Sequence, residues 1–233
     1  MLFLLTGEVQ IGKTRWLEKL VADLAERGVP CAGVLAPGQW VASAGERADG
    51  NGYEKLGIDN VLLPSGECIP FARRGDLARA DGTFDEGSQA ARAELAWHIS
   101  DVAIEHVNAH FRKLRSLVRA ESVPESEGSP RLRCPGLLVV DELGRLEIWR
   151  GGGLTEAVAL LAEGPSAAFP HALVVVRDYL ADDAEALLAD VWPDRMRIAP
   201  DESGRAAVLS AVRAAELLSS SLPSASRAVL GGC

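Results

Sequence analysis

Apolar and polar residues follow two different patterns along the chain. Short apolar-rich runs, of the kind that form buried strands, occur at residues 1–5, 31–36, 136–141, 171–176 and 195–199. Apolar positions at helical spacing occur between them, at residues 13–27, 155–163, 181–190 and 203–218. Uninterrupted apolar strands are typical of a parallel sheet that is covered on both faces. The alternation therefore predicts an α/β fold, a three-layer sandwich with a mostly parallel sheet.

Four segments depart from this alternation. Residues 37–85 are rich in Gly, Pro, Asn and Asp between short apolar patches, which predicts a small antiparallel β excursion. Helix formers without proline fill residues 86–119 and predict one long helix or two joined with a bend. Residues 120–135 predict an exposed polar loop, and residues 219–233 a flexible tail. We therefore expect a single domain over residues 1–218.

A glycine-rich motif follows the first apolar run and begins the first helix. Its residues are Gly7, Glu8, Val9, Gln10, Ile11, Gly12, Lys13 and Thr14, which match GxxxxGK[ST]. The two glycines let the backbone curl so that its N–H groups point at phosphate oxygens, and the helix N-terminus adds positive charge. Lys13 can then reach the β- and γ-phosphates, while the Thr14 hydroxyl can bind Mg²⁺. A tight turn that binds nothing is the simpler alternative, but the strand-to-helix setting favours phosphate.

Two acidic residues end the apolar run at residues 136–141. Asp141 and Glu142 follow Leu137-Leu138-Val139-Val140, and the carboxyl end of a buried strand opens into the ligand crevice of an α/β sheet. Asp141 is placed to hold Mg²⁺, and Glu142 to orient or deprotonate a water molecule. Many strands end in a solvated acidic turn, so this pair predicts a site only in combination with the phosphate loop.

Together these motifs resemble the cancer-related nucleoside-triphosphatase family, compact P-loop proteins whose phosphate loop lies almost at the N-terminus. The similar stretches are residues 7–14, 33–36 with Gly52-Tyr53, 141–147 and 202–205. The family's acidic signature is Asp-Glu-Ile-Gly-Lys-Met-Glu-Leu, and this chain has Asp-Glu-Leu-Gly-Arg-Leu-Glu-Ile from Asp141. The resemblance implies hydrolysis of nucleoside triphosphates with broad base tolerance, with Asp141 on magnesium and Glu142 acting on water. Two departures are Gln10, where the family usually has a third glycine, and the long segment 86–135.

Arginines after the strands are candidates for neutralising charge on the γ-phosphate. Arg177 follows the run at residues 171–176, whose end should face the same crevice, and it completes a catalytic set with Lys13 and Glu142. Arg145 and Arg150 lie on a predicted loop that ends in three glycines. For each arginine the alternative is a solvated surface position.

Other chemistry-bearing residues have simpler interpretations. His98, His106 and His110 share the predicted helical segment, and packed or solvated histidines are favoured over a metal site. Tyr53 follows a turn-rich stretch that could place its ring near a bound nucleotide, but a ring packed within the protein is the favoured interpretation.

The charge balance limits the partners of the protein. The chain has 24 basic and 33 acidic residues and a net charge of −9, which argues against nucleic acid and anionic membranes as main partners. Small anions are not excluded, because Lys13 is one of few lysines and lies in the phosphate loop. Four cysteines without a CxxC pair and the lack of a long apolar segment predict a cytoplasmic protein without a zinc ribbon.

The leading hypothesis is a Mg²⁺-dependent nucleoside triphosphatase acting on ATP- or GTP-type nucleotides. A nucleotide or nucleoside kinase is the first alternative, with Arg73-Arg74 and residues 37–85 as a lid. A nucleotide-gated binding module with negligible hydrolysis is the second, in which residues 37–85 or 120–135 become ordered. The base preference, the oligomeric state and any arginine from a neighbouring subunit stay open.

Overall fold

The computed structural model describes residues 1–121 and 136–221. Its strands form one mixed sheet in the order β6-β5-β4-β2-β7-β8-β1-β9, with β3 paired to β4. The strands are β1 (Leu2–Leu5), β2 (Cys31–Leu35), β3 (Gly38–Ala42), β4 (Tyr53–Leu63), β5 (Glu67–Arg74), β6 (Trp97–Ile99), β7 (Leu137–Leu143), β8 (His171–Val176) and β9 (Arg195–Ile198). β2, β7, β8, β1 and β9 run parallel, while β3, β4, β5 and β6 add an antiparallel extension.

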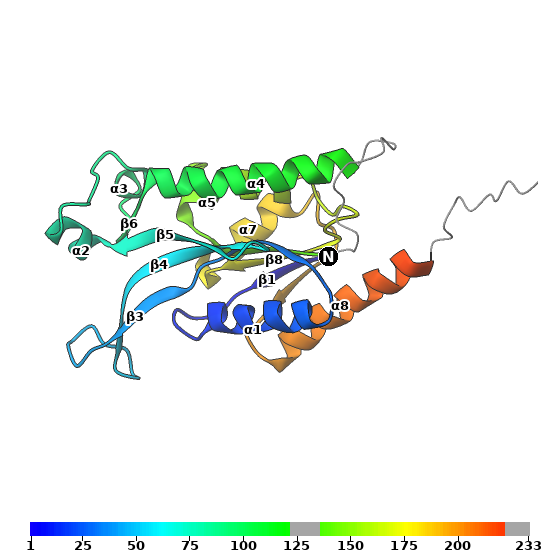
Figure 1. The fold of residues 1–233 in the computed structure, drawn as a ribbon, viewed down its shortest axis with the longest axis horizontal. Helices are drawn as coiled ribbons and strands as arrows, with labels where there is room; N and C mark the ends of the chain where they lie inside the picture. Colours follow the sequence, from blue (N-terminus) through cyan, green and yellow to red (C-terminus); the bar gives the residue numbers. More distant parts are fainter. Residues whose placement is uncertain (122–135, 222–233) are drawn as a thin grey trace, which may run out of the picture.

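Helices cover both faces of the sheet (Figure 1). The helices are α1 (Lys13–Glu26), α2 (Gly75–Ala80), α3 (Gln89–Arg92), α4 (Asp101–Glu121), α5 (Arg145–Arg150), α6 (Thr155–Leu161), α7 (Ala181–Leu188) and α8 (Glu202–Ser221), with a 3₁₀ turn, η1 (Asp178–Leu180). α1 and α8 lie on one face, and α4 to α7 lie on the other. The chain thus has the predicted three-layer α/β architecture.

Alternation along the buried strands produces two hydrophobic cores. Leu2 and Leu4 of β1 pack in the core beneath α4, α6 and α7, whereas Phe3 and Leu5 pack in the core with α1 and α8. All four side chains are fully buried. Because successive strand residues point to opposite faces, an uninterrupted apolar run supplies both cores at once.

The antiparallel excursion predicted for residues 37–85 is present. β4 pairs with β2, β3 and β5, and it therefore joins the excursion to the parallel strands in one continuous sheet. The expected loop at 120–135 lies almost wholly outside the described residues. The expected tail begins inside α8, which continues to Ser221, and residues 222–233 also lie outside the described part.

The helical prediction for residues 86–119 was wrong in its first half. A short helix, α3, is followed by strand β6, and only then does the long helix α4 begin. β6 pairs with β5, with His98 opposite Arg73. Residues with helix propensity therefore form a strand here, because the edge of β5 offers backbone hydrogen-bond partners. A second correction concerns Arg145 and Arg150, which lie in the helix α5 and not on a loop.

Candidate functional site

The glycine-rich motif forms the turn between β1 and α1. Gly7 has φ +134°, and a Cβ at this position would lie 2.5 Å from Cδ1 of Ile11. Gly12 has φ +93°, so both glycines take backbone conformations that other residues rarely adopt. Gln10, which stands where similar proteins have a third glycine, also has a positive φ of 67°. The loop therefore keeps a glycine-like turn at this position despite its side chain.

Lys13 lies over the loop that precedes it. Its Nζ donates hydrogen bonds to the carbonyl oxygens of Gly7 at 2.6 Å and Glu8 at 2.8 Å. Burial lowers the pKa of Lys13, while the carboxylates of Glu142 and Asp178 oppose this shift. The ammonium group is therefore held by neutral carbonyls, which a phosphate can replace at little electrostatic cost.

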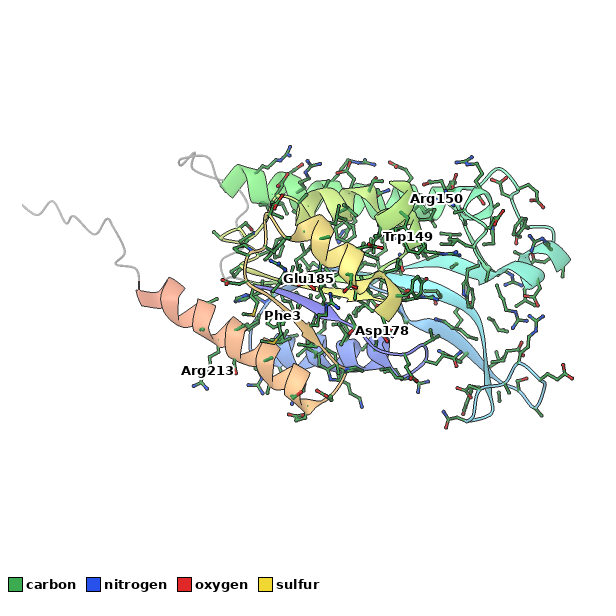
Figure 2. The ribbon with its side chains drawn as sticks, turned by 180° about the vertical axis from the view of Figure 1, so that it is seen from behind. Phe3, Trp149, Arg150, Asp178, Glu185 and Arg213 are labelled. Carbon is green, nitrogen blue, oxygen red and sulfur yellow. The ribbon has the colours of Figure 1, made fainter. Side chains whose placement is uncertain are left out.

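Asp178 is a member of the site that the sequence did not indicate. It begins the turn after β8, and its Oδ1 accepts a hydrogen bond of 2.5 Å from the backbone N–H of Gly7. A carboxylate oxygen of the protein thus accepts a hydrogen bond from one backbone N–H group of the loop, in the place where a bound anion could accept it. Figure 2 shows Asp178 on the side of the sheet end toward α1, whereas Arg150 lies with the opposite helical layer.

Asp141 is buried, with 3% of its surface exposed, near the end of β7. One oxygen accepts a 3.0 Å hydrogen bond from the backbone N–H of Ala36, and the other lies 3.5 Å from the Thr14 hydroxyl. Burial raises the pKa of Asp141 to about 6, although the Ala36 hydrogen bond opposes the shift. A cation beside this carboxylate would offset its desolvation.

The oxygen donors of Asp141 and Thr14 fit magnesium. They are hard ligands, and a separation of 3.5 Å is too long for a strong hydrogen bond between them. Within residues 1–121 and 136–221 there is no cluster of three or more His, Cys, Asp or Glu side chains suited to a metal ion. Magnesium at phosphate sites needs few protein ligands, because phosphates and water complete its shell.

Glu142 is the extra residue of a β-bulge. Asp141 pairs with Val175 and Leu143 with Val176, so Glu142 has no partner across the β7–β8 register. A bulge re-aims a side chain, and Glu142 points to the crevice while Asp141 and Leu143 remain buried. Its Oε1 accepts a 2.7 Å ion-pair hydrogen bond from Nε of Arg177. Burial is the largest single effect on the pKa of Arg177 and lowers it, but the charges and hydrogen bonds of Glu142 and Tyr179 together outweigh burial and raise the pKa.

The antiparallel extension adds a second lysine. Lys55 of β4 places its Nζ 5.8 Å from the centre of the Trp40 ring and 5.6 Å from that of Trp97. Burial lowers its pKa, while the nearby charges of Glu142 and Asp141 oppose this shift. Among the described residues no carboxylate forms an ion pair with Lys55. The scarcity of lysine in the chain was the single sequence signal that could have indicated Lys55.

These groups surround one chamber of about 380 Å³. Lys13, Thr14, Asp141, Glu142 and Arg177 line it together, as do loop residues Val9, Gln10 and Gly12. The extension contributes Trp40 and Lys55, and the turn before β4 contributes Asp49 and Asn51. Tyr53 does not line the chamber, and 47% of this residue is exposed.

The remaining candidates lie elsewhere. Arg73 and Arg74, which the kinase alternative would use in a lid, pair with Asp81 and Glu54. Arg47, on the loop before β4, pairs with Asp76. The three histidines do not share a site. His106 pairs with Glu67, His110 bonds to the Gly33 carbonyl oxygen, and His98 is buried in β6.

In two of the stretches that resemble the nucleoside-triphosphatase family, side chains form hydrogen bonds that hold neighbouring elements together. Glu147 accepts hydrogen bonds from the backbone N–H groups of Gly144 at 2.8 Å and Leu154 at 2.9 Å. It therefore fixes the start of α5 and the glycine turn that follows it. Arg205 joins α8 to Asp23 of α1 through its Nε at 3.0 Å.

The order of the strands, the helices on both faces and the glycine-rich loop after β1 define the fold: a P-loop NTPase-like α/β fold with a mixed sheet. A solved structure, that of THEP1 from the hyperthermophile Aquifex aeolicus, aligns with 91% of this chain and 96% of that chain at a TM-score of 0.54. The aligned residues are 14% identical, so the likeness shows the fold alone. No protein-family model matches the chain, and no curated protein matches it. None of the helices in the described part is long and apolar enough to cross a membrane.

Proposed function

We propose that the protein is a Mg²⁺-dependent nucleoside triphosphatase that converts ATP- or GTP-type nucleotides to the diphosphate and phosphate. The observation that carries the proposal is the meeting of the Gly7–Thr14 loop with Asp141 and Glu142 in one chamber. A glycine loop alone binds phosphate, whereas a carboxylate pair at its mouth adds a metal ligand and a base.

The loop and Lys13 bind the triphosphate. Lys13 exchanges its two carbonyl contacts for the β- and γ-phosphates, and the backbone N–H groups of the loop face the same oxygens. Asp178 must leave the N–H of Gly7 for this donor to reach phosphate. Thr14 and Asp141 would hold magnesium, which would supply positive charge to neutralise the phosphates.

Glu142 acts on water at the far side of the γ-phosphate. Its carboxylate accepts a proton from the attacking water, whose oxygen forms a bond to phosphorus as the bond to the β-phosphate oxygen breaks. The ion pair with Arg177 fixes the orientation of the carboxylate and brings a guanidinium to the same point. Lys55 adds positive charge from the extension.

A phosphate-release panel tests the proposal. Release is measured from ATP, GTP, CTP and UTP, with and without Mg²⁺, on the wild type and on Glu142→Gln. We expect release that requires Mg²⁺ and falls by about 10²- to 10⁴-fold in Glu142→Gln, with nucleotide binding retained, because only the base is lost. Asp183→Asn, a change at a carboxylate that bonds the exposed Trp149, is the matched control. Equal release by Glu142→Gln and the wild type would contradict hydrolysis at this site.

A further inference from the structure

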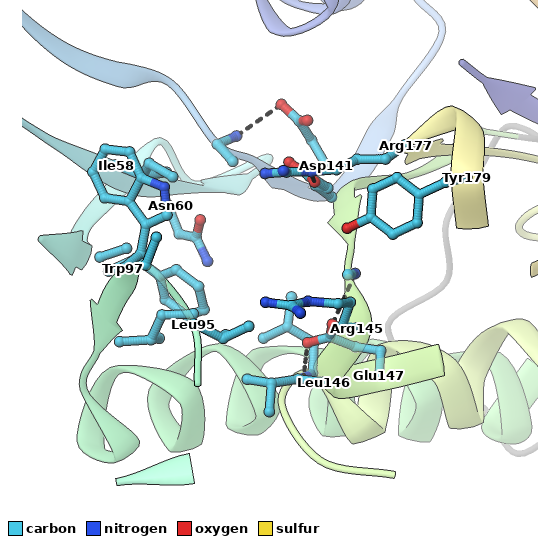
Figure 3. A pocket seen from close by; sticks show the side chains of 18 residues that line it. Ile58, Asn60, Leu95, Trp97, Asp141, Arg145, Leu146, Glu147, Arg177 and Tyr179 are labelled. Atoms are coloured by element: carbon cyan, nitrogen blue, oxygen red, sulfur yellow. Dashed lines mark hydrogen bonds and ion pairs between the residues drawn. The ribbon is translucent and has the colours of Figure 1, made fainter. Parts of the chain in front are cut away.

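A second cavity, of about 210 Å³, adjoins the phosphate chamber. The two spaces share Ile58, Trp97, Asp141, Glu142 and Arg177 as a common wall. Figure 3 shows Asn60 and Trp97 on one side of the second cavity and Arg145 and Tyr179 on the other. The cavity lies beyond Glu142 from the phosphate loop and is separate from the space that the triphosphate would fill.

Asn60 is an unusual residue in this wall. Its side chain is 1% exposed, and neither its Nδ2 nor its Oδ1 has a hydrogen-bond partner. The alternation of β4 places it on the same face as Leu62, which belongs to the hydrophobic core. A buried amide without partners destabilises the folded protein, and such groups are rare in native structures.

Asn108 provides the contrast within the same molecule. It is also buried, on α4, but its Nδ2 donates to the Gly153 carbonyl at 2.9 Å and its Oδ1 accepts from the N–H of Glu156 at 3.0 Å. Its amide is therefore part of the packing between helices. Asn60 is buried more deeply than Asn108 but makes none of these contacts, and it lines the cavity.

Apolar side chains form the flanks of the cavity, and charged side chains of both signs line the rest of it. Phe71, Leu95 and Leu146 form apolar walls around the Asn60 amide. Arg145 lines the opposite side, and no carboxylate of the described residues forms an ion pair with it. Arg177 and the carboxylates of Asp141, Glu142 and Glu147 also line the cavity. Arg177 pairs with Glu142, and Asp141 and Glu147 accept hydrogen bonds from backbone N–H groups. Apolar walls, the Asn60 amide and the unpaired guanidinium of Arg145 therefore define a site for a planar ring with an amide edge and an anionic substituent.

We propose that this cavity binds a small planar heterocycle with a donor next to an acceptor, as in a pyrimidine base, and with an anionic group. Asn60 pairs with the amide edge through both of its polar atoms, and Arg145 pairs with the anion. The site goes beyond nucleotide hydrolysis and does not depend on it.

Three probes separate these contacts. Uracil carries the amide edge alone, orotate carries the edge and a carboxylate, and benzoate carries only a ring and a carboxylate. Titration calorimetry on the full chain is expected to order their affinities as orotate, then uracil, then benzoate. Asn60→Leu should weaken orotate and uracil by about tenfold or more, while Arg145→Met should weaken orotate and spare uracil. Lys13→Ala, a change at a residue that does not line this cavity, should bind the probes like the wild type, which keeps this test independent of turnover.

Thermal unfolding supplies a second test that needs no ligand. Asn60→Leu removes two unpartnered polar atoms, so we expect Tm to rise by about 2–8 °C. Asn108→Leu leaves the Gly153 carbonyl and the Glu156 N–H unpartnered, so Tm should fall. Binding of none of the three probes, or probe binding that is unchanged in Asn60→Leu, would overturn the proposal. A fall in Tm for Asn60→Leu would overturn it too, because it would show that Asn60 stabilises the protein without a ligand.

Discussion

The parallel strands and the antiparallel extension contribute to the crevice in different ways. Around the ends of the parallel strands the polar groups have partners: Lys13 contacts loop carbonyls, Asp141 contacts the Ala36 N–H, and Glu142 pairs with Arg177. The extension contributes Lys55, which no described carboxylate pairs, and Asn60, whose amide has no partner. One region is preorganised by its own contacts, whereas the other presents groups that only a ligand can satisfy.

This difference indicates a division of labour. Groups that are already oriented lose little freedom when a transition state forms, which suits the residues proposed for catalysis. Groups that are buried without partners lower stability until something binds, which suits recognition. We therefore expect changes near the parallel strands to alter turnover, and changes in the extension to alter affinity.

Lys13→Ala, near the parallel strands, should reduce turnover more than any change in the extension. The loop keeps its backbone but loses the cation that faces the β- and γ-phosphates, so kcat/KM for phosphate release should fall by about 10²- to 10³-fold. Stopped-flow or steady-state phosphate release measures the loss, and circular dichroism checks the fold. Lys19→Ala, at an exposed position of α1, is the matched control. If both variants lost activity equally, the preorganised role of the loop lysine would be refuted.

Lys55→Met tests the extension with a smaller expected effect. Methionine keeps an unbranched stem between the Trp40 and Trp97 rings but removes the charge. We expect KM to rise about tenfold with kcat little changed, because the charge attracts the nucleotide and does not touch the reacting atoms. The difference should shrink at about 0.5 M salt, since screening weakens the field. Lys113→Met, at an exposed position of α4, serves as the control; a loss confined to kcat would remove the distinction between the regions.

The same two regions differ in how far the sequence predicted them. The loop and the Asp141-Glu142 pair are local patterns, and neighbouring residues fix their place at the ends of the parallel strands. Lys55 and Asn60 reach the crevice only through the pairing of β4 with β2 and β5, which includes a register shift between Ile58 and Asp59. β6 was missed for a related reason, because pairing with β5 overrode the helix propensity of its neighbours.

Two histidines of α4 offer the smallest and most specific test of the comparison. His110 faces the parallel strands, where its Nε2 donates to the Gly33 carbonyl of β2 at 3.1 Å, whereas His106 faces the extension and pairs with Glu67 of β5 at 3.0 Å. Burial lowers the pKa of His110 below 6.5, against the effect of the Gly33 hydrogen bond; the charge of Lys113 also lowers it, and that of Glu67 raises it.

The unfolded chain therefore takes up a proton at His110 at a higher pH than the folded protein does. The contribution of His110 to the free energy of unfolding should then fall as pH decreases through 6.5 toward its lower folded pKa, whereas the raised pKa of Asp141 acts in the opposite direction and is common to all the variants compared. His110→Gln, which keeps a donor for Gly33, should flatten this dependence in urea unfolding between about pH 7 and pH 5. The His106–Glu67 pair is half exposed on both sides, so His106→Gln should leave the slope close to that of the wild type. A slope that responds to His106 and not to His110 would mean that the extension, and not the parallel region, sets the acid sensitivity of the fold.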